Sequence, residues 1–279
     1  MNPLLPVLPL PRTGSSGTGI SYYTSIIRCP RKVNLDRELK NEDDRSNGAA
    51  AVGIVTHQLD ELYYGEKTDN PLVLQISDVN WGDAISEARR CWEAYIKRYP
   101  GKYWWGRVVA VEDQYPKDEA EEALVAEVIG TTPFTTRIDR VIEVTAESST
   151  RILSNTDLGT LKPGIYLYDR KTKGKQDGEA ALTHANSVQF YAYMIVYNVI
   201  HPKNPCLGLI VDELITTKEV KFRQFLVTPP DEVQQRVVRA LVANAKTLEN
   251  SDAALGVAHG CKEYNRFCPH LISGACQRS

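Results

Sequence analysis

The stretch GIYLYDRKTK, residues 164–173, is a short apolar run that ends in charged side chains. A run of this kind predicts a β-strand. Two earlier stretches have a similar character, VVAVEDQY at 108–115 and the alternating FTTRIDRVIEV at 134–144, and two later ones occupy 206–216 and 220–228. The sequence therefore predicts five strands from residue 108 onward.

Helical periodicity surrounds these strands, with apolar residues recurring at spacings of three and four. The expected helices cover residues 21–40, 48–64, 81–99, 178–200 and 231–249. The polar, turn-rich segment 145–163 is interpreted as a long hairpin connection or an insertion. The resulting order, helices, three strands, a helix, two strands and a helix, indicates an α/β protein.

The chain has 279 residues, 42% hydrophobic and 24% charged, and a formal net charge of -2. Its apolar content excludes a disordered chain, its Gly and Pro content excludes a collagen-like polymer, and charges interrupt every apolar stretch before it could span a bilayer. We expect a soluble protein that does not bind membranes. The expected parts are a flexible tail at 1–20 and a single domain at 21–279, divided into a helical part (21–106), a core (107–250) and a cysteine-rich tail (251–279).

The near-neutral charge argues against a protein that coats nucleic acid through bulk charge, and it leaves room for a local basic groove. No secretory signal is visible in the proline-rich start MNPLLPVLPLPRTGSSGTG. We therefore expect a reducing, cytoplasmic compartment.

Two carboxylates and a lysine form the first candidate site. Asp169 and Lys171 are spaced as Asp-x-Lys in a strand, so both side chains point to one face, and a neighbouring strand can bring Asp139 beside them. Two carboxylates suit Mg²⁺ or Mn²⁺, and the lysine can orient or deprotonate a water and stabilise charge on a phosphoryl oxygen. The set implies phosphodiester hydrolysis, although an isolated Asp-x-Lys is more often a charged strand end.

Further residues support this interpretation through their order in the chain. His57 lies on an early predicted helix, while Gln189 and Tyr193, four residues apart, share one face of a later helix. Both could donate to a phosphate; otherwise Tyr193 is a core aromatic and Gln189 a solvated residue. Glu112, in the strand before Asp139, is a weaker candidate for an extra carboxylate and equally suits a solvated strand position.

Four segments carry a resemblance to a known family: VGIVTH at 52–57, RIDRVIEV at 137–144, LYDRKTK at 167–173 and QFYAY at 189–193. They resemble the motifs of the RecB-like branch of the PD-(D/E)XK nucleases, which includes the nuclease domains of RecB and AddB, CRISPR-associated RecB-like exonucleases and many phage exonucleases. The resemblance runs from about residue 21 to the C-terminus. It implies a restriction-endonuclease-like core, a central mixed sheet flanked by helices, in which a metal cluster joins the N-terminal helical region to the cysteine-rich tail.

The resemblance also implies roles for the matching residues. The implied metal ligands are His57, Asp139, Asp169 and the backbone carbonyl of Arg170, with Glu112 as the weak addition. The implied catalytic residues are the lysine Lys171 with Asp139, Asp169, Gln189 and Tyr193. Within this last set, Gln189 and Tyr193 would match the family's Q-x-x-x-Y element, which contacts DNA near the site.

Four of the six cysteines form a second candidate site, Cys29 near the start and Cys261, Cys268 and Cys276 near the end. Four thiolates suit a cubane iron–sulfur cluster or a Cys₄ zinc site, and the spacing alone leaves Zn²⁺ a strong competitor. The resemblance favours a [4Fe–4S] cluster, because iron–sulfur members of the family carry one cysteine before the nuclease core and three after it. Cys91 and Cys206 lie in apolar contexts and are expected to be buried.

Basic and aromatic residues supply candidate DNA contacts. The basic groups are Arg28, Arg31 and Lys32 near Cys29, and Arg170, Lys173 and Lys175 beside the Asp-x-Lys pair. Next to a metal centre they would neutralise phosphates and give salt-sensitive binding. The aromatics that could stack on bases, with a packing role as the default, are Tyr22, Tyr23, Trp104 and Trp105.

These features predict a metal-dependent DNA exonuclease that acts in recombination, repair or phage DNA processing, in the cytoplasm of a bacterial or phage-infected cell. Its substrate would be single-stranded or duplex DNA ends, and its candidate partners are a helicase, an annealing protein or a second copy of the chain. The first alternative is a non-catalytic iron–sulfur DNA-binding or assembly subunit, against which the intact Asp139, Asp169 and Lys171 argue. An iron–sulfur electron-transfer or sensor protein would leave these three residues unexplained.

Overall fold

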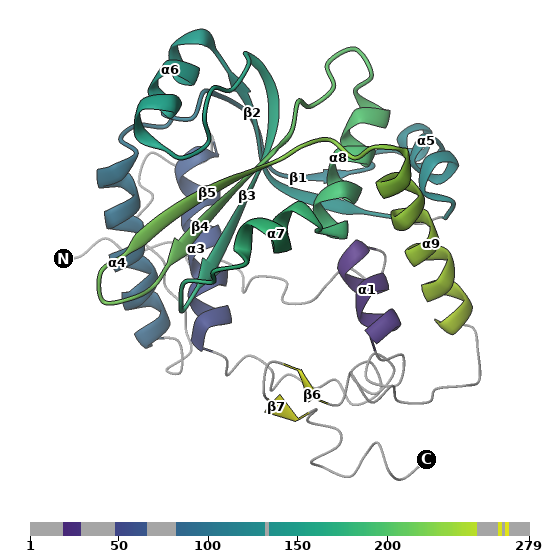
Figure 1. Ribbon diagram of the computed structural model, residues 1–279, viewed down its shortest axis with the longest axis horizontal. Coiled ribbons are helices and arrows are strands. Elements are labelled where there is room, and N and C mark those ends of the chain that lie inside the picture. The colour runs from purple at the N-terminus through teal and green to yellow at the C-terminus, as the bar shows by residue number, and fades with distance from the viewer. Residues whose placement is uncertain are drawn as a thin grey trace, which may run out of the picture.

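The computed structural model describes residues 19–28, 48–65, 82–131, 134–249, 262–263 and 266–267. A mixed five-stranded sheet with helices on both faces forms the body of the protein, which is therefore of the α/β class (Figure 1). The strands, in spatial order, are β1 (Arg107–Tyr115), β2 (Thr136–Val144), β3 (Gly164–Lys173), β4 (Leu209–Ile215) and β5 (Lys221–Val227).

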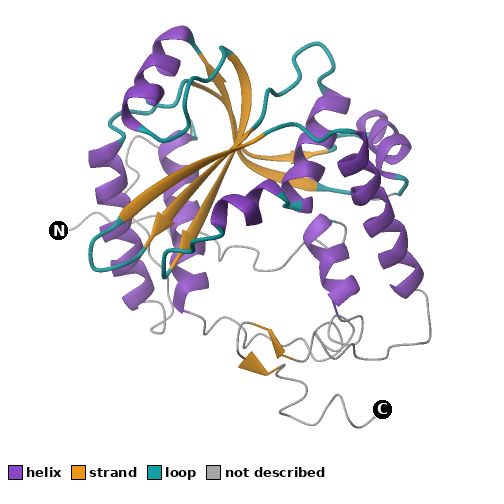
Figure 2. Cartoon of the chain, viewed as in Figure 1, coloured by secondary structure: helices purple, strands orange, loops and turns teal. Residues whose placement is uncertain are grey.

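The sheet contains one parallel pair, and that pair explains where the connecting helices lie. β1 with β2, β2 with β3, and β4 with β5 are antiparallel, whereas β3 and β4 are parallel. A parallel pair needs a crossover connection, and the chain makes it through α7 (Ala180–Ala185) and α8 (Val188–Ile200) (Figure 2). Because helices cover both faces of the sheet, successive side chains along a strand point alternately into two apolar cores, rather than into a core and into solvent.

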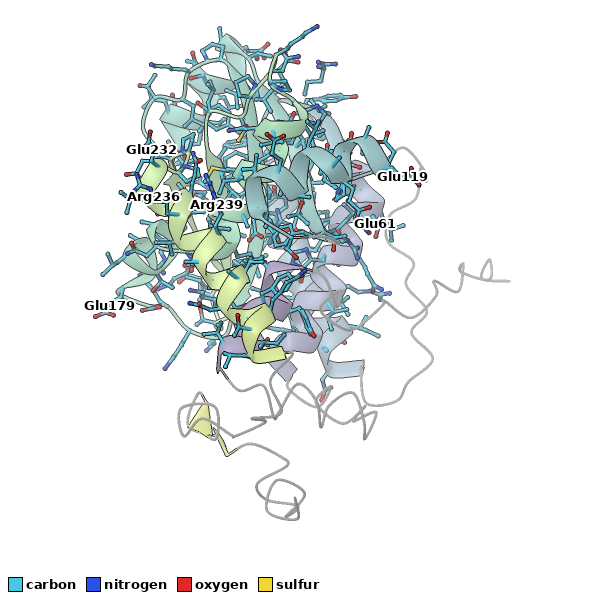
Figure 3. The ribbon with its side chains drawn as sticks, turned by 90° about the vertical axis from the view of Figure 1, so that its right-hand side faces the viewer. Glu61, Glu119, Glu179, Glu232, Arg236 and Arg239 are labelled. Atoms are coloured by element: carbon cyan, nitrogen blue, oxygen red, sulfur yellow. The ribbon has the colours of Figure 1, made fainter. Side chains whose placement is uncertain are left out.

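The remaining helices divide between the two sides of the sheet. They are α1 (Ile20–Arg28), α3 (Gly48–Tyr64), α4 (Gly82–Arg98), α5 (Glu119–Ile129), α6 (Ala146–Asn155) and α9 (Glu232–Glu249). A separate two-stranded pair consists of β6 (Lys262–Glu263) and β7 (Arg266–Phe267). Figure 3 shows Glu232, Arg236 and Arg239 along the outward side of α9, where Arg236 pairs with Glu232 at 3.2 Å.

The two cores can be followed along adjacent residues of one strand. Val141 of β2 and Leu167 of β3 pack in the core that α1, α5, α8 and α9 complete. Their neighbours Ile142 and Tyr168 pack in the other core, against α3, α4 and α6. Adjacent strand residues therefore lie on opposite sides of a sheet that is buried on both faces.

The five predicted strands are confirmed, and segment 145–163 connects the antiparallel strands β2 and β3, as the hairpin interpretation predicts. The helices in that segment and over 178–200 differ from the prediction. Segment 145–163 contains α6, which begins at a capping box in which the Thr145 side chain accepts from the Ser148 amide and the Ser148 hydroxyl from the Thr145 amide. The helix predicted over 178–200 is two helices, because Ser187 caps the start of α8 by accepting from the Phe190 amide.

Helix α5 also differs from the prediction, because no helix was expected there although the residues at both of its ends are typical of helix termini. The Asp118 side chain accepts from the Glu121 amide at the start, and Gly130 ends the helix with a φ of 84°, a left-handed conformation that glycine adopts without strain. Of the first predicted helix, residues 20–28 form α1, and 29–40 lie outside the described residues.

Two of the six cysteines lie in the part of the chain that the structure describes. Cys91 and Cys206 are buried, as predicted. The candidate cluster ligands Cys29, Cys261, Cys268 and Cys276 lie outside the described residues. No helix among the described residues has both the length and the apolar character needed to cross a membrane.

Candidate functional site

Three side chains from three elements form a group that could hold a metal ion: His57 of α3, Glu112 of β1 and Asp139 of β2. One ligand atom from each lies within 4.8 Å of the others. His57 Nδ1 is 3.4 Å from Asp139 Oδ2 and 3.7 Å from Glu112 Oε1. An imidazole with two carboxylates is a donor set that can hold a divalent metal ion.

The pairing of β1 with β2 places the two carboxylates together. Val111 lies opposite Arg140 and Asp113 opposite Ile138, so the intervening Glu112 faces Asp139. The register shifts between Val108 and Ala110, and Glu112 has a φ of 49°, the only positive φ among the non-glycine residues that the structure describes. A left-handed backbone at such a residue costs roughly 1–3 kcal/mol, and strain of this kind concentrates at functional sites.

Asp169 and Lys171 of β3 lie beside this group on the same side of the sheet, as the Asp-x-Lys spacing predicts. Lys171 Nζ donates to Asp169 Oδ1 at 3.1 Å. Lys171 Nζ also lies 2.9 Å from Asp169 Oδ2, but this contact is not a hydrogen bond. The buried Oδ2 therefore accepts no hydrogen bond from the described residues. The backbone amide of Arg170 donates to Asp139 Oδ2 at 2.8 Å, which ties β3 to the carboxylate of β2.

The electrostatics of the site favour a bound positive charge. Burial alone would lower the pKa of His57, but the carboxylates of Asp139 and Glu112 outweigh it and raise that pKa to about 9. Burial raises the pKa of Asp169 to about 6, against the opposing effect of Lys171. Burial and the neighbouring Glu112 likewise raise the pKa of Asp139. The carboxylates thus hold a proton on His57, and a cation bound there would replace that proton.

Helix α8 covers the lysine. Lys171 Nζ lies 5.4 Å from the centre of the Phe190 ring, and Gln189 Nε2 donates to the Tyr193 hydroxyl at 2.7 Å. Burial and the charge of Asp169 raise the pKa of Tyr193, so its hydroxyl stays protonated at neutral pH. Gln189 and Tyr193 therefore form one polar pair next to Asp169 and Lys171.

Not every residue predicted for the site is placed as the sequence implied. His57 and Asp139 come together, but the third member of their group is Glu112, the weakest sequence candidate, while Asp169 pairs with Lys171. Arg170 was also expected among the phosphate-neutralising cations. That expectation is wrong, because its guanidinium is wholly buried.

Two residues next to the site were missed. Arg137 Nε donates to Glu112 Oε2 at 2.5 Å and fixes the carboxylate; its place two residues before Asp139 in the alternating strand is the signal that could have identified it. Asp60, three residues after His57 on α3, is buried and was not singled out. The four aromatics Tyr22, Tyr23, Trp104 and Trp105 are buried, which agrees with their default packing role.

A second charged cluster lies one strand further along. The Glu213 side chain of β4, fully buried and opposite Lys171 in the register, contacts Lys173 Nζ at 2.5 Å, Arg223 Nη2 at 2.6 Å and His184 Nε2 at 2.7 Å. Burial alone would raise the pKa of Glu213, but these hydrogen bonds outweigh it and lower the pKa from 4.5 to about 2.

Glu213→Gln is expected to lower the free energy of unfolding at pH 7 by on the order of 3 kcal/mol. Because the folded-state pKa is depressed, this stability is fully present above pH 4.5 and is lost as the pH falls from 4.5 toward 2. Urea unfolding of both proteins at several pH values measures the difference. Glu143→Gln, which breaks the surface pair with Arg107, should cost about 1 kcal/mol or less. Equal losses in the two variants would contradict the prediction.

Comparisons with known proteins find similarity only at the level of structure. No protein-family model and no curated protein sequence matches the chain. A solved structure described as a "Putative exonuclease" from Eubacterium rectale is similar with a TM-score of 0.46 and 12% identity, over 84% of this chain and 81% of that one. Another, SSO0001, is similar with a TM-score of 0.39 and 14% identity, over 87% and 81%. At these TM-scores the likeness is distant, and function has to be inferred from the side chains of the site.

Proposed function

We propose that this protein is a metal-dependent deoxyribonuclease of the RecB-like PD-(D/E)XK type, with a restriction-endonuclease-like core, and that it hydrolyses phosphodiester bonds from DNA ends. The observation that carries the proposal is the side-by-side placement of a His–Glu–Asp group and an Asp–Lys pair on three neighbouring strands and one helix. We infer a role in DNA recombination, repair or phage DNA processing.

The donor set fits a hard divalent cation. His57, Glu112 and Asp139 supply one nitrogen and two carboxylates whose ligand atoms lie within 4.8 Å of one another, and the buried Oδ2 of Asp169 has no donor among the described residues. We propose these four as the metal ligands, with the Arg170 carbonyl as a further oxygen. A bound Mg²⁺ or Mn²⁺ would polarise the phosphate and lower the pKa of a water.

The protein's own residues would do the remaining work. Burial opposes the charged form of Lys171, but Asp169 and Asp139 outweigh it and raise the pKa of the lysine, so that Lys171 stays an ammonium at neutral pH. We propose that it orients the attacking water and stabilises charge on the phosphoryl oxygen. The Tyr193 hydroxyl and Gln189 would contact the DNA backbone beside it.

The proposal predicts cleavage that needs both a metal ion and a DNA end. With Mg²⁺ or Mn²⁺ the protein should degrade end-labelled linear DNA, and a chelator should abolish the reaction, because the proposal relies on the cation to polarise the phosphate and to lower the pKa of the attacking water. Covalently closed circular DNA of the same sequence is the control. Gel analysis of both substrates measures the cleavage. Cleavage of the circle contradicts exonuclease action, and cleavage in the presence of a chelator contradicts the requirement for a metal ion.

We also propose a [4Fe–4S] cluster on Cys29, Cys261, Cys268 and Cys276, on the basis of the sequence and its family resemblance. Anaerobically purified protein should absorb at about 400 nm through iron–sulfur charge transfer, and Cys268→Ser should remove that band. Cys91→Ser, at a buried cysteine outside the proposed set, should retain it. Zinc without iron in the purified wild type would contradict the cluster and favour a Cys₄ zinc site.

A further inference from the structure

Four charged side chains are buried behind the candidate site, on the other side of the sheet. They are Asp60 of α3, Arg140 of β2, Arg170 of β3 and Asp212 of β4, each at most 2% exposed. The formal charges of two guanidinium groups and two carboxylates cancel. Removing any one member would leave an uncompensated charge in the interior.

The contacts centre on Asp60 and Arg170. Arg170 Nη1 donates to Asp60 Oδ1 at 2.9 Å, and its Nη2 lies 3.3 Å from Asp212 Oδ2. Arg140 Nη2 lies 3.9 Å from Asp60 Oδ2. Asp60 therefore contacts both arginines, whereas Asp212 contacts only one of them, Arg170, and also accepts from the Tyr168 hydroxyl and from Gln224 Nε2.

Aromatic rings hold the two guanidinium groups in place. Arg140 Cζ lies 3.6 Å from the centre of the Tyr168 ring and 4.0 Å from that of Tyr64, so the group is sandwiched between two π faces. None of its nitrogens has a hydrogen-bond partner among the described residues. Arg170 Cζ lies 3.7 Å from the centre of the Tyr95 ring. Such stacking demands a planar guanidinium, which lysine cannot supply.

The chain connects this cluster directly to the candidate site. Arg140 follows Asp139 and Arg170 follows Asp169, so in each strand the site carboxylate points to one side of the sheet and the arginine to the other. Asp60 lies three residues after His57, on the next turn of a helix that packs against β3 (Figure 1). The elements joined by Asp60 are thus the three that present His57, Asp139 and Asp169.

We infer that Asp60, Arg140 and Arg170 are positioning residues that fix α3, β2 and β3 relative to one another, so that His57, Asp139 and Asp169 converge on one cation. The inference rests on the proposed function, since it assigns these residues to the same metal site. Residues behind a metal site that orient its ligands typically change metal affinity by 10–100-fold when mutated.

The test compares Asp60→Asn with Asp212→Asn in the full chain. Each substitution removes one buried carboxylate from the same cluster, but Asp212 lies on β4, which carries no proposed ligand. Calorimetric titration with Mn²⁺ alone should show affinity at least about tenfold weaker for Asp60→Asn and within about threefold of wild type for Asp212→Asn. Equal affinities in the two variants overturn the inference.

A second measurement needs no metal. The Arg170 amide donates to Asp139, so its hydrogen exchange reports how closely β3 is held to that carboxylate. Its exchange should be faster in Asp60→Asn than in Asp212→Asn. If wild type binds no Mn²⁺, the proposed metal site fails, and the exchange comparison still decides whether Asp60 positions the strands; equal exchange overturns that role.

A charge-balanced variant separates positioning from general stability. Asp60→Asn combined with Arg140→Met restores electrical neutrality, so the double variant should unfold at a urea concentration closer to that of wild type even where Asp60→Asn alone folds poorly. Its Mn²⁺ affinity should stay at least about tenfold weakened, because the contact between α3 and β2 is still missing. Recovery of affinity together with stability would show that the cluster acts only structurally and would overturn the inference.

Discussion

Lys171→Ala is expected to lower kcat for DNA hydrolysis by about 10³-fold while Mn²⁺ binds as tightly as in wild type or more tightly. The loss follows because the ammonium beside Asp169 is removed from the place where phosphoryl charge would develop. Metal affinity should not fall, because deleting a cation next to two carboxylates reduces repulsion of the metal. Steady-state kinetics at saturating Mn²⁺ and calorimetric titration measure the two quantities separately.

Lys173→Ala is the matched control for this prediction. Lys173 is the next residue on the same side of β3, but it pairs with Glu213 rather than with a carboxylate of the site. Its removal should reduce kcat by about threefold or less, because the charge it neutralises lies outside the site. Equal loss in the two variants would mean that Lys171 acts through general charge, and unchanged kcat in Lys171→Ala would remove it from catalysis.

The strands and the Asp-x-Lys pair were predictable because both depend on local spacing. Two-residue periodicity places Asp169 and Lys171 on one side of any strand, whatever surrounds it. The convergence of Asp139 with His57 followed only from the family resemblance, since no local rule fixes how a helix meets a strand. The structure shows that contact at 3.4 Å.

Glu112 is a weak candidate from the sequence because its position depends on strand pairing. Its place beside His57 and Asp139 goes with the register that sets it opposite Asp139, the shift between Val108 and Ala110, and a positive φ. None of these is encoded in the local alternation of β1. Position in a register is a property of two strands together, so a single segment cannot show it.

Arg170 was misjudged for a different reason. It stands between Asp169 and Lys171 in the sequence, so it was expected to reach a phosphate from an exposed position. Here helices cover both faces, so the alternate residues enter a second core, where Arg140 and Arg170 require buried partners. Asp60 supplies one, yet nothing in the spacing of α3 distinguishes it from a surface acid.

Glu112→Gln and Asp139→Asn are each expected to weaken Mn²⁺ binding by about 100-fold or more, because each removes one of the two carboxylates closest to His57. Both also remove a charge that keeps His57 protonated, so the pKa of His57 should fall from about 9. Titration calorimetry measures the affinity, and NMR of the imidazole measures the pKa. Glu112→Gln is the sharper test, because Glu112 is only a weak candidate from the sequence and the geometry is what brings it into the group with His57 and Asp139.

Asp113→Asn provides the control on the same strand. Asp113 is adjacent to Glu112 in sequence but pairs with Lys117 at 2.8 Å and does not belong to the group of His57, Glu112 and Asp139, so the same loss of one carboxylate should leave Mn²⁺ affinity within about threefold. Asp169→Asn then distinguishes two sets of metal ligands. One is His57, Asp139 and Asp169, which the family motif implies, and the other is His57, Glu112 and Asp139, which the geometry brings together. If Asp169→Asn weakens binding while Glu112→Gln does not, the set implied by the family motif is correct and Glu112 serves only to hold Arg137. If Glu112→Gln weakens binding, the cation lies between β1 and β2, and the β-bulge at the start of β1 is part of the site.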